Sequence, residues 1–202
     1  MKIGIMGGTF DPIHKGHLML GEYAQKLYDL DKIWFMPNGN PPHKLNSNIE
    51  SQANHRVEMV KLAIEDYAGF DIQLYEVERK EVNYSYLTMK HFNDIFPEDE
   101  FYFIIGADSL FAFESWKHPE LLVKTCKILA AYRDGKKTSE MEEQIEYLNE
   151  KYGAEILLLN TPNVDVSSSD IRRMIKNNED ISDLVPTSVL SYIQTNKLFR
   201  DE

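Results

Sequence analysis

A glycine-rich segment near the start of the chain carries two histidines that could bind a phosphate. It reads Gly7-Gly8-Thr9-Phe10-Asp11-Pro12-Ile13-His14-Lys15-Gly16-His17. Paired glycines expose consecutive N–H groups, and a helix start adds further donors and the positive end of the helix dipole. Two imidazoles three residues apart can each donate to a phosphoryl oxygen. We interpret the segment as a phosphate site. A plain glycine turn stays open as an alternative, as does a zinc site, although no third ligand is evident nearby.

A run of three serines followed by an arginine is a second candidate for binding phosphate. It reads Val166-Ser167-Ser168-Ser169-Asp170-Ile171-Arg172 and starts a predicted helix. Ser167 and Asp170 have the spacing of a capping box, so a capped helix without a ligand is one interpretation. One serine is enough to cap a helix, which leaves two hydroxyls and Arg172 for an anion.

Three smaller features also follow predicted strands. Pro41-Pro42-His43-Lys44 is either a solvated turn or a loop that presents two basic groups. Asp108, in Gly106-Ala107-Asp108, could cap the next helix or hold a ribose hydroxyl. Trp116 is either a core residue or a platform for a ring.

Alternating strands and helices must position these segments. Apolar runs predict strands at 2–6, 32–37, 71–78, 101–106, 127–132 and 155–160. Helical spacing predicts helices at 16–30, 57–67, 84–96 and 139–152, a short one near 119, and two more that begin near 167 and 187. Strands that are apolar throughout are typical of a parallel sheet covered on both faces. We predict an α/β fold: a single Rossmann-like, doubly wound domain over residues 1–202, which binds ligands where its strands end.

Composition restricts the classes of partner. The chain has 22 Lys and Arg against 33 Asp and Glu, a net charge of −11, which argues against a nucleic-acid binder. Residues 1–45 are the exception, with five Lys and four acids, so an anion is expected there. Cys126 is the single cysteine, which excludes an intrachain disulfide. No apolar run approaches the roughly 20 residues of a membrane span, and no signal peptide is visible, so we expect a cytoplasmic protein.

The histidine segment resembles the G-x-F-D-x-x-H-x-G-H signature of the nucleotidyltransferase superfamily. It lacks both the Walker A lysine motif and G-x-G-x-x-G, which disfavours P-loop ATPases and dinucleotide oxidoreductases. The serine segment is similar to the superfamily's I-S-S-T-x-x-R element, with Val166 for Ile and Ser169 for Thr. The P-x-x-x-P-P-H-K and G-A-D…W segments look like those of bacterial nicotinate-nucleotide adenylyltransferases. Residues 83–88 correspond to that family's S-Y-T-x-D-T, with Leu87 in place of the acid.

This resemblance implies adenylyl transfer from ATP to nicotinate mononucleotide, giving deamido-NAD and pyrophosphate in NAD biosynthesis. Mg²⁺ is expected with ATP and not in a protein cage. No nucleic acid or membrane partner is expected, and assembly of several copies stays open. The alternatives are transfer to another acceptor, such as nicotinamide mononucleotide (NMN) or phosphopantetheine, and a nucleotide-sensing module without turnover.

The residues that we expect at the site fall into three groups. Those expected to act in catalysis are His14, His17, Lys44 and Arg172. Those expected to bind ATP are Gly7, Gly8, Thr9, Phe10, Gly16, Gly106, Asp108, Ser168 and Ser169, with the helices at about 167–198 completing this part. Those expected to bind nicotinate mononucleotide are Asn38, His43, Lys44, Tyr84, Ser85 and Trp116.

Overall fold

A single parallel sheet forms the centre of the molecule. The computed structural model describes residues 1–39, 49–79, 81–132, 138–162 and 166–200. Within them the strands are β1 (Lys2–Gly8), β2 (Lys32–Pro37), β3 (Phe70–Ile72), β4 (Glu100–Gly106), β5 (Lys127–Ala131) and β6 (Ile156–Leu159). Their order is β3-β2-β1-β4-β5-β6, and all neighbouring pairs are parallel. The order reverses between β1 and β4, where such sheets bind ligands.

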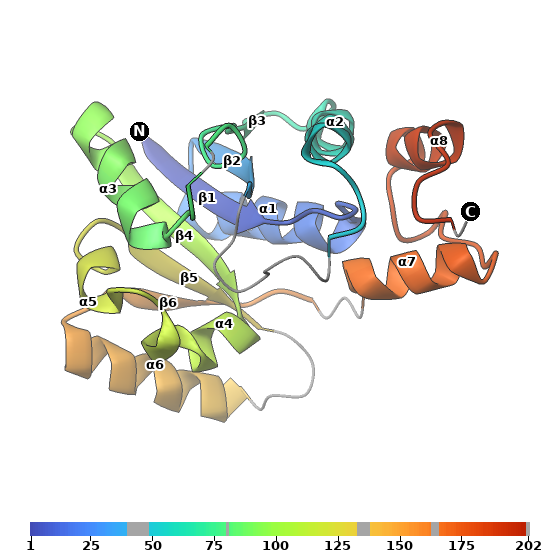
Figure 1. The fold of residues 1–202 in the computed structure, drawn as a ribbon. Coiled ribbons are helices and arrows are strands. Elements are labelled where there is room, and N and C mark those ends of the chain that lie inside the picture. Colours follow the sequence, from blue (N-terminus) through green and yellow to red (C-terminus); the bar gives the residue numbers. More distant parts are fainter. Residues whose placement is uncertain (40–48, 80, 133–137, 163–165, 201–202) are drawn as a thin grey trace.

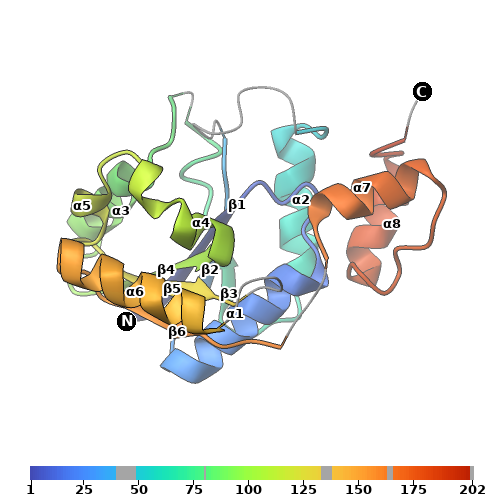
Figure 2. The ribbon, with the colours of Figure 1, turned by 90° about the horizontal axis from the view of Figure 1, so that it is seen from below.

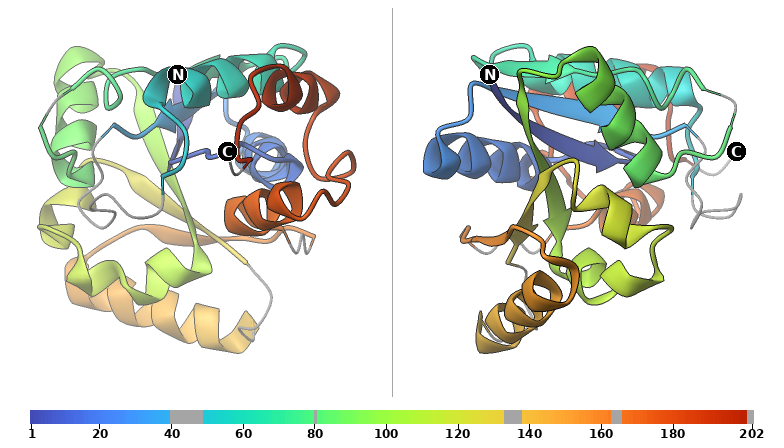
Figure 3. Two further views of the ribbon diagram at one scale, coloured as in Figure 1. Left: turned by 45° about the vertical axis from the view of Figure 1, so that its right-hand side comes forward. Right: turned by 90° about the vertical axis from the view of Figure 1, so that its left-hand side faces the viewer.

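Helices cover both faces of this sheet, as Figures 1 and 2 show. One face packs against α1 (Lys15–Tyr28) and α2 (Ala53–Ile64). The other packs against α3 (Ser85–Ile95), α4 (Ala107–Phe111), the 3₁₀ turn η1 (Phe113–Ser115), α5 (Pro119–Leu122) and α6 (Thr138–Tyr152). The last helices, α7 (Ser168–Lys176) and α8 (Thr187–Thr195), lie beside the first face, where α8 packs on α2 (Figure 3). None of these helices has the length and apolarity needed to cross a membrane.

The two sheet faces bury separate clusters of apolar side chains. Ile104 and Leu129 belong to the cluster beneath α1 and α2, whereas their neighbours Phe103 and Ile128 belong to the cluster beneath α3 and α6. Successive residues of a strand point to opposite faces, so both sets are buried only if both faces are covered. This explains the uninterrupted apolar runs, and the predicted α/β fold is confirmed.

The third strand is shorter than predicted. We predicted a strand over 71–78, but β3 is Phe70–Ile72 and turns follow it. The N–H of Gln73 still donates to the carbonyl of Phe35 at 2.9 Å, and the chain then leaves the sheet. The physical reason is that the backbone then bonds to itself: the N–H of Glu78 donates to the carbonyl of Leu74 at 3.1 Å and that of Arg79 to Glu76 at 3.4 Å, which makes turns in place of strand pairing.

Candidate active site

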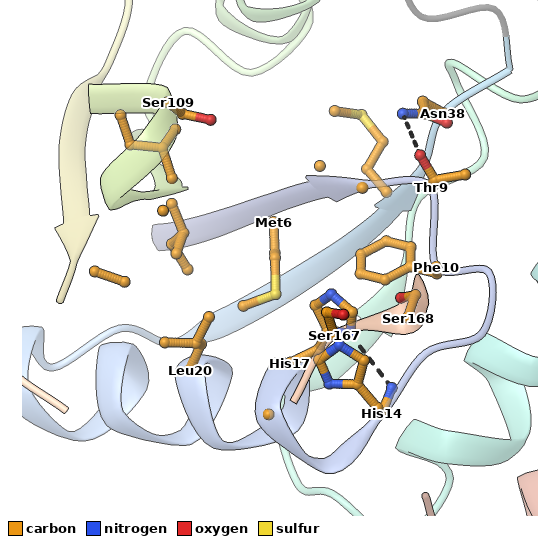
Figure 4. Close-up of a pocket in the computed structure, with 18 of the residues that line it drawn as sticks. Met6, Thr9, Phe10, His14, His17, Leu20, Asn38, Ser109, Ser167 and Ser168 are labelled. Carbon is orange, nitrogen blue, oxygen red and sulfur yellow. Dashed lines mark hydrogen bonds between the residues drawn. The ribbon is translucent and has the colours of Figure 1, made fainter. Parts of the chain in front are cut away.

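A cleft of about 740 Å³ opens at the carboxyl ends of the central strands. It gathers most of the residues predicted to act at the site, from the loop after β1 to the start of α7 (Figure 4). These residues are Gly7, Gly8, Thr9, Phe10, His14, Gly16, His17, Asn38, Tyr84, Ser85, Gly106, Trp116, Ser168, Ser169 and Arg172. The histidine and serine segments, which lie at opposite ends of the sequence, therefore meet in one place.

Three of the predicted residues are not in this group. His43 and Lys44 lie outside the described residues. Asp108 is exposed and does not line the cleft, and it does not cap α4 either, because the N-cap position is Gly106. The helix-cap interpretation of Asp108 is therefore wrong, while its contact with a ribose stays a prediction.

His14 and His17 are stacked at the start of α1. Their ring centroids are 3.7 Å apart, with 25° between the ring planes. The backbone N–H of His14 donates to Nδ1 of His17 at 3.3 Å, the contact dashed in Figure 4. Because Nδ1 accepts this bond, the neutral His17 ring carries its proton on Nε2. The local backbone thus sets which nitrogen of His17 can donate to a ligand.

Close packing holds this histidine pair in place. The ring of Phe10 meets His17 edge-on, with the centroids 5.0 Å apart and the planes at 79°. A Cβ atom added at Gly16 would lie 3.0 Å from Nδ1 of His14 and 3.1 Å from Cγ1 of Val166. Gly16 therefore leaves the space that the His14 ring occupies, in agreement with its proposed place in the segment.

Asp11 anchors the loop after β1. Its side chain is almost fully buried, at 1% exposed. It accepts from the backbone N–H groups of Glu50, at 2.7 Å, and of Ser51, at 3.3 Å, and from the Ser51 hydroxyl. Those residues precede α2, so the Asp11 carboxylate joins the histidine segment to the second helix.

Arg56 is a further buried anchor, and we did not predict it from the sequence. Its guanidinium donates to the carbonyls of Thr9 and Asn38, both at 2.8 Å. It thereby fastens the loops after β1 and β2 to each other, beside the cleft. Burial lowers the pKa of Arg56, and the nearby charge of Asp11 opposes this effect. One signal was available: Arg56 lies on the buried face of α2, at helical spacing from Met59 and Val60.

The start of α7 is bound to the histidine segment. The Ser167 side chain accepts from the N–H of Asp170 at 3.1 Å, which confirms the predicted N-cap. Ser168 Oγ donates to the carbonyl of Pro12 at 2.9 Å. Arg172 Nη1 donates to the carbonyl of Asp11 at 2.7 Å. Two side chains of α7 therefore contact the loop backbone directly, which places the serines opposite the histidines.

The other half of the cleft lies between β2, α3 and the segment before α5. Tyr84 is the N-cap residue of α3 and provides no side-chain cap, so the first turn directs backbone N–H groups toward its open end. Trp116 lines this half and packs against Phe113, with ring centroids 5.5 Å apart. Leu87 is 46% exposed and lies outside the lining, so its lack of a carboxylate leaves no gap in the cleft.

A buried carboxyl that was not predicted from the sequence also lines this half. Glu76 is 7% exposed and accepts from the Thr88 hydroxyl at 2.8 Å. Its backbone carbonyl accepts from Nδ2 of Asn83 at 2.9 Å. Burial raises the pKa of Glu76 to about 7, and the Thr88 hydrogen bond partly opposes that rise.

One buried hydroxyl beyond β6 has no hydrogen-bond partner in the described part of the chain. Thr161 is 6% exposed, lines the cleft, and adjoins Pro162, which lines it too. Leu20 and Ala131 add apolar surface to the same lining. An unpaired buried hydroxyl is unfavourable, so this position suits a ligand with a polar edge.

The donor groups of the cleft indicate which kind of ligand it suits. Among the residues that the structure describes, no group of three or more His, Cys, Asp or Glu side chains is placed to hold a metal ion. The donors that converge on the cleft are imidazoles, hydroxyls, a guanidinium and backbone N–H groups. This donor set is suited to phosphate oxygens.

A family model and individual relatives of known family both match this chain. The cytidylyltransferase-like family model matches residues 5–174. "Probable nicotinate-nucleotide adenylyltransferase" of Clostridium botulinum (strain Alaska E43 / Type E3) is 43% identical over 203 residues, which cover 100% of this chain and 99% of that protein. The protein of the same name from Lachnoclostridium phytofermentans is 44% identical over 193 residues, covering 95% of this chain and 96% of its own length.

A solved structure shows the same fold at lower identity. Plasmodium falciparum nicotinic acid mononucleotide adenylyltransferase complexed with NaAD superimposes with a TM-score of 0.78. The match covers 98% of this chain and 97% of the other, at 23% sequence identity. The arrangement of strands and helices is therefore shared over the whole length.

Proposed function

This chain belongs to the nicotinate-nucleotide adenylyltransferase family of cytidylyltransferase-like nucleotidyltransferases, and we propose that its cleft joins ATP to nicotinate mononucleotide. The activity is adenylyl transfer in NAD biosynthesis, with deamido-NAD and pyrophosphate as products. One observation carries the assignment of the site: the stacked pair His14 and His17 faces Ser168 and Arg172 across a single cleft.

The reaction needs positioning more than it needs a protein nucleophile. The phosphate of nicotinate mononucleotide attacks the α-phosphorus of ATP in line, and pyrophosphate leaves on the opposite side. A phosphate is nucleophilic at neutral pH, so no general base is required. The obstacle is bringing two polyanions together, which fixed donors and positive charge overcome.

The histidines are placed to stabilise charge at the α-phosphate. His17 offers its Nε2 proton, because Nδ1 accepts from the backbone of His14. Gly7 and Gly8, at the end of β1, bring the backbone close to the same phosphate. Donors held rigidly by packing act without rearranging during the reaction, which is the basis of their effect.

Ser168, Ser169 and Arg172 are placed to hold the leaving pyrophosphate. Arg172 has five donors, so it can keep its bond to the Asp11 carbonyl while other N–H groups meet phosphate oxygens. We propose that Lys44 offsets the negative charge of the phosphates from the opposite side. Mg²⁺ enters as part of the MgATP substrate, held by the phosphates and water, since the Asp11 carboxylate is already occupied by the residues before α2.

The base of ATP and the nicotinate ring are assigned to different parts of the cleft lining. Leu20, Ala131 and Pro162 offer an apolar surface to the base of ATP, with the Thr161 hydroxyl at its edge. Ser85 and the backbone N–H groups that begin α3 meet the nicotinate carboxylate, while Trp116 packs against the pyridine ring.

Release of pyrophosphate from ATP tests this function directly. Four reactions are compared: nicotinate mononucleotide, NMN, phosphopantetheine and no acceptor. Release that requires nicotinate mononucleotide, together with formation of deamido-NAD, is the expected result. Release with phosphopantetheine alone would reassign the acceptor, and ATP binding without release under any condition would indicate a nucleotide sensor.

A further inference from the structure

Glu76 has an unusual position for a carboxyl group. It lies in the half of the cleft assigned to the pyridine nucleotide, together with Asn83, Tyr84 and Ser85. Thr88, the fourth residue of α3, donates to its carboxyl at 2.8 Å, and Asn83, just before α3, donates to its backbone carbonyl at 2.9 Å. Residues just before and within the first turn of α3 thus hold Glu76 beside the helix start to which the nicotinate group is assigned.

The backbone around Glu76 is packed too closely to move aside. A Cβ atom at Gly39 would lie 2.4 Å from the Glu76 carbonyl oxygen and 3.1 Å from Cα of Val77. The segment after β2 therefore presses directly on the turn that carries Glu76. The turn is therefore packed between Gly39 on one side and α3 on the other, which fixes the position of its carboxyl at the cleft.

In the described part of the chain, no cationic side chain forms an ion pair with this carboxyl, whose side-chain partner is Thr88. Arg79 pairs with Glu81 at 3.6 Å and donates to the Tyr75 hydroxyl at 2.9 Å. Of the two described residues directly after β2, Asn38 lines the cleft and is uncharged. The other described titratable groups on the segment from β3 to the end of α3 are Asp71, Tyr75, Glu78, Arg79, Glu81, Tyr84, Tyr86, Lys90, His91 and Asp94, and Lys117 lines the same cleft. Burial is the largest influence on the pKa of Glu76, which it raises to about 7.

The candidate acceptors differ at the group that enters this half of the cleft. Nicotinate mononucleotide and NMN share the ribose, the phosphate and the pyridinium ring. The first carries a carboxylate on the ring and the second carries an uncharged amide. An ionised Glu76 would repel the carboxylate but accept a hydrogen bond from the amide. A protonated Glu76 would remove the repulsion and donate a hydrogen bond.

We propose that Glu76 links the choice of acceptor to protonation: nicotinate mononucleotide binds with uptake of one proton at Glu76, and NMN binds without it. The proton comes from solvent, and no covalent bond changes. Above neutral pH the enzyme must acquire this proton before it accepts the acid. The preference for acid over amide therefore decreases as pH rises. This link rests on the proposed function, because it requires the nicotinate carboxylate to lie at the start of α3.

Calorimetric titration measures the proton directly. Each acceptor is bound to the full-length enzyme at pH 8 in two buffers of different ionisation enthalpy, which gives the number of protons taken up. NMN is the matched control, since its phosphate and ribose are the same. We expect nicotinate mononucleotide to take up close to one proton more than NMN. Equal uptake by the two acceptors would overturn the proposal.

Two variants assign the proton to Glu76. Glu76→Gln keeps the size and the acceptor for Thr88 but cannot ionise, so the extra uptake should disappear. In the wild type, kcat/KM for nicotinate mononucleotide divided by kcat/KM for NMN should decrease by up to tenfold per pH unit as pH rises. In Glu76→Gln this ratio should stay constant. Thr88→Val removes a hydrogen bond that lowers the pKa of Glu76. In this variant the decrease in the preference for nicotinate mononucleotide over NMN should therefore occur at higher pH.

The outcomes separate this proposal from the proposed function. A wild-type enzyme that uses nicotinate mononucleotide with a pH-independent ratio would contradict the role of Glu76 alone. An enzyme that turns over neither acceptor would contradict the function. An unshifted profile in Thr88→Val, with the extra proton uptake retained in Glu76→Gln, would assign the proton to another group and overturn the proposal.

Discussion

Arg172 Nη1 donates to the backbone carbonyl of Asp11 at 2.7 Å, across 161 residues of sequence. The same arginine lies 3.3 Å, measured from Nε, from the carboxylate of Glu50, which also pairs with Lys176 at 3.1 Å. The guanidinium is therefore shared between the loop that carries the histidines and the segment that leads into α2. A group in this position orders the site and supplies positive charge to it.

Replacement of Arg172 by Lys should separate these two contributions. A lysine keeps the charge but cannot bind the Asp11 carbonyl and an anion in the planar geometry of a guanidinium. We expect kcat of Arg172→Lys to be about 10²-fold below that of the wild type, and kcat of Arg172→Ala to be lower still. Pyrophosphate release measures both. Arg173→Ala is the matched control, because Arg173 is 68% exposed and pairs with Asp170. A lysine variant with wild-type kcat would show that charge alone suffices.

His17→Ala tests the histidine pair. The variant loses a donor that strengthens in the transition state, and we expect kcat to fall about 10²–10³-fold with the fold intact. Circular dichroism checks the fold, and turnover is measured at saturating ATP and acceptor. His55→Ala is a suitable comparison, since His55 contacts Tyr192 at the packing of α2 on α8 and does not line the cleft. Near-normal turnover in His17→Ala would remove His17 from the mechanism.

The features that were predictable from sequence are those that depend on neighbouring residues. Strand and helix periodicity required only short windows, and the Ser167 cap needed four consecutive residues. The placement of His14 and His17 together at a helix start likewise followed from residues close in sequence. Parallel strands bring their carboxyl ends to one edge, so the meeting of the two phosphate segments followed once the fold class was recognised.

The features that were missed depend on contacts between distant segments. Arg56 binds the carbonyl of Thr9, 47 residues away, and nothing in its local sequence marks the acceptor. Glu76 was assigned to a strand because its neighbours are apolar, whereas Thr88 and the close approach of Gly39 determine its burial. The lack of a partner for Thr161 is visible only when all surrounding atoms are in place.

Thr161→Val and Thr88→Val form a matched pair for stability. The Thr161 hydroxyl is buried and has no partner in the described part of the chain, so its replacement should raise the free energy of unfolding by about 1 kcal/mol. The Thr88 hydroxyl donates to Glu76, so the same replacement should lower it by about 1–3 kcal/mol. Urea denaturation without ligands measures both. Two changes of the same sign would contradict this assignment of the two hydroxyls.

The stability of the ligand-free protein should depend on pH through Glu76. Burial raises its pKa from the ordinary 4.5 to about 7 in the folded protein, so the folded state holds the proton over this interval. The folded state then binds more protons than the unfolded state, and the free energy of unfolding decreases as pH rises from about 4.5 to 7. The decrease attributable to Glu76 is about 3 kcal/mol.

Glu76→Gln isolates this contribution. The amide does not titrate, so the variant should lose less stability than the wild type between pH 5 and pH 8, and the difference between the two curves should level off above pH 8. Urea denaturation at closely spaced pH values measures both curves. Glu78→Gln serves as the control, since its position in the same turn tests for effects of charge removal alone. Parallel curves for wild type and Glu76→Gln would show that the carboxyl titrates alike in the folded and unfolded states.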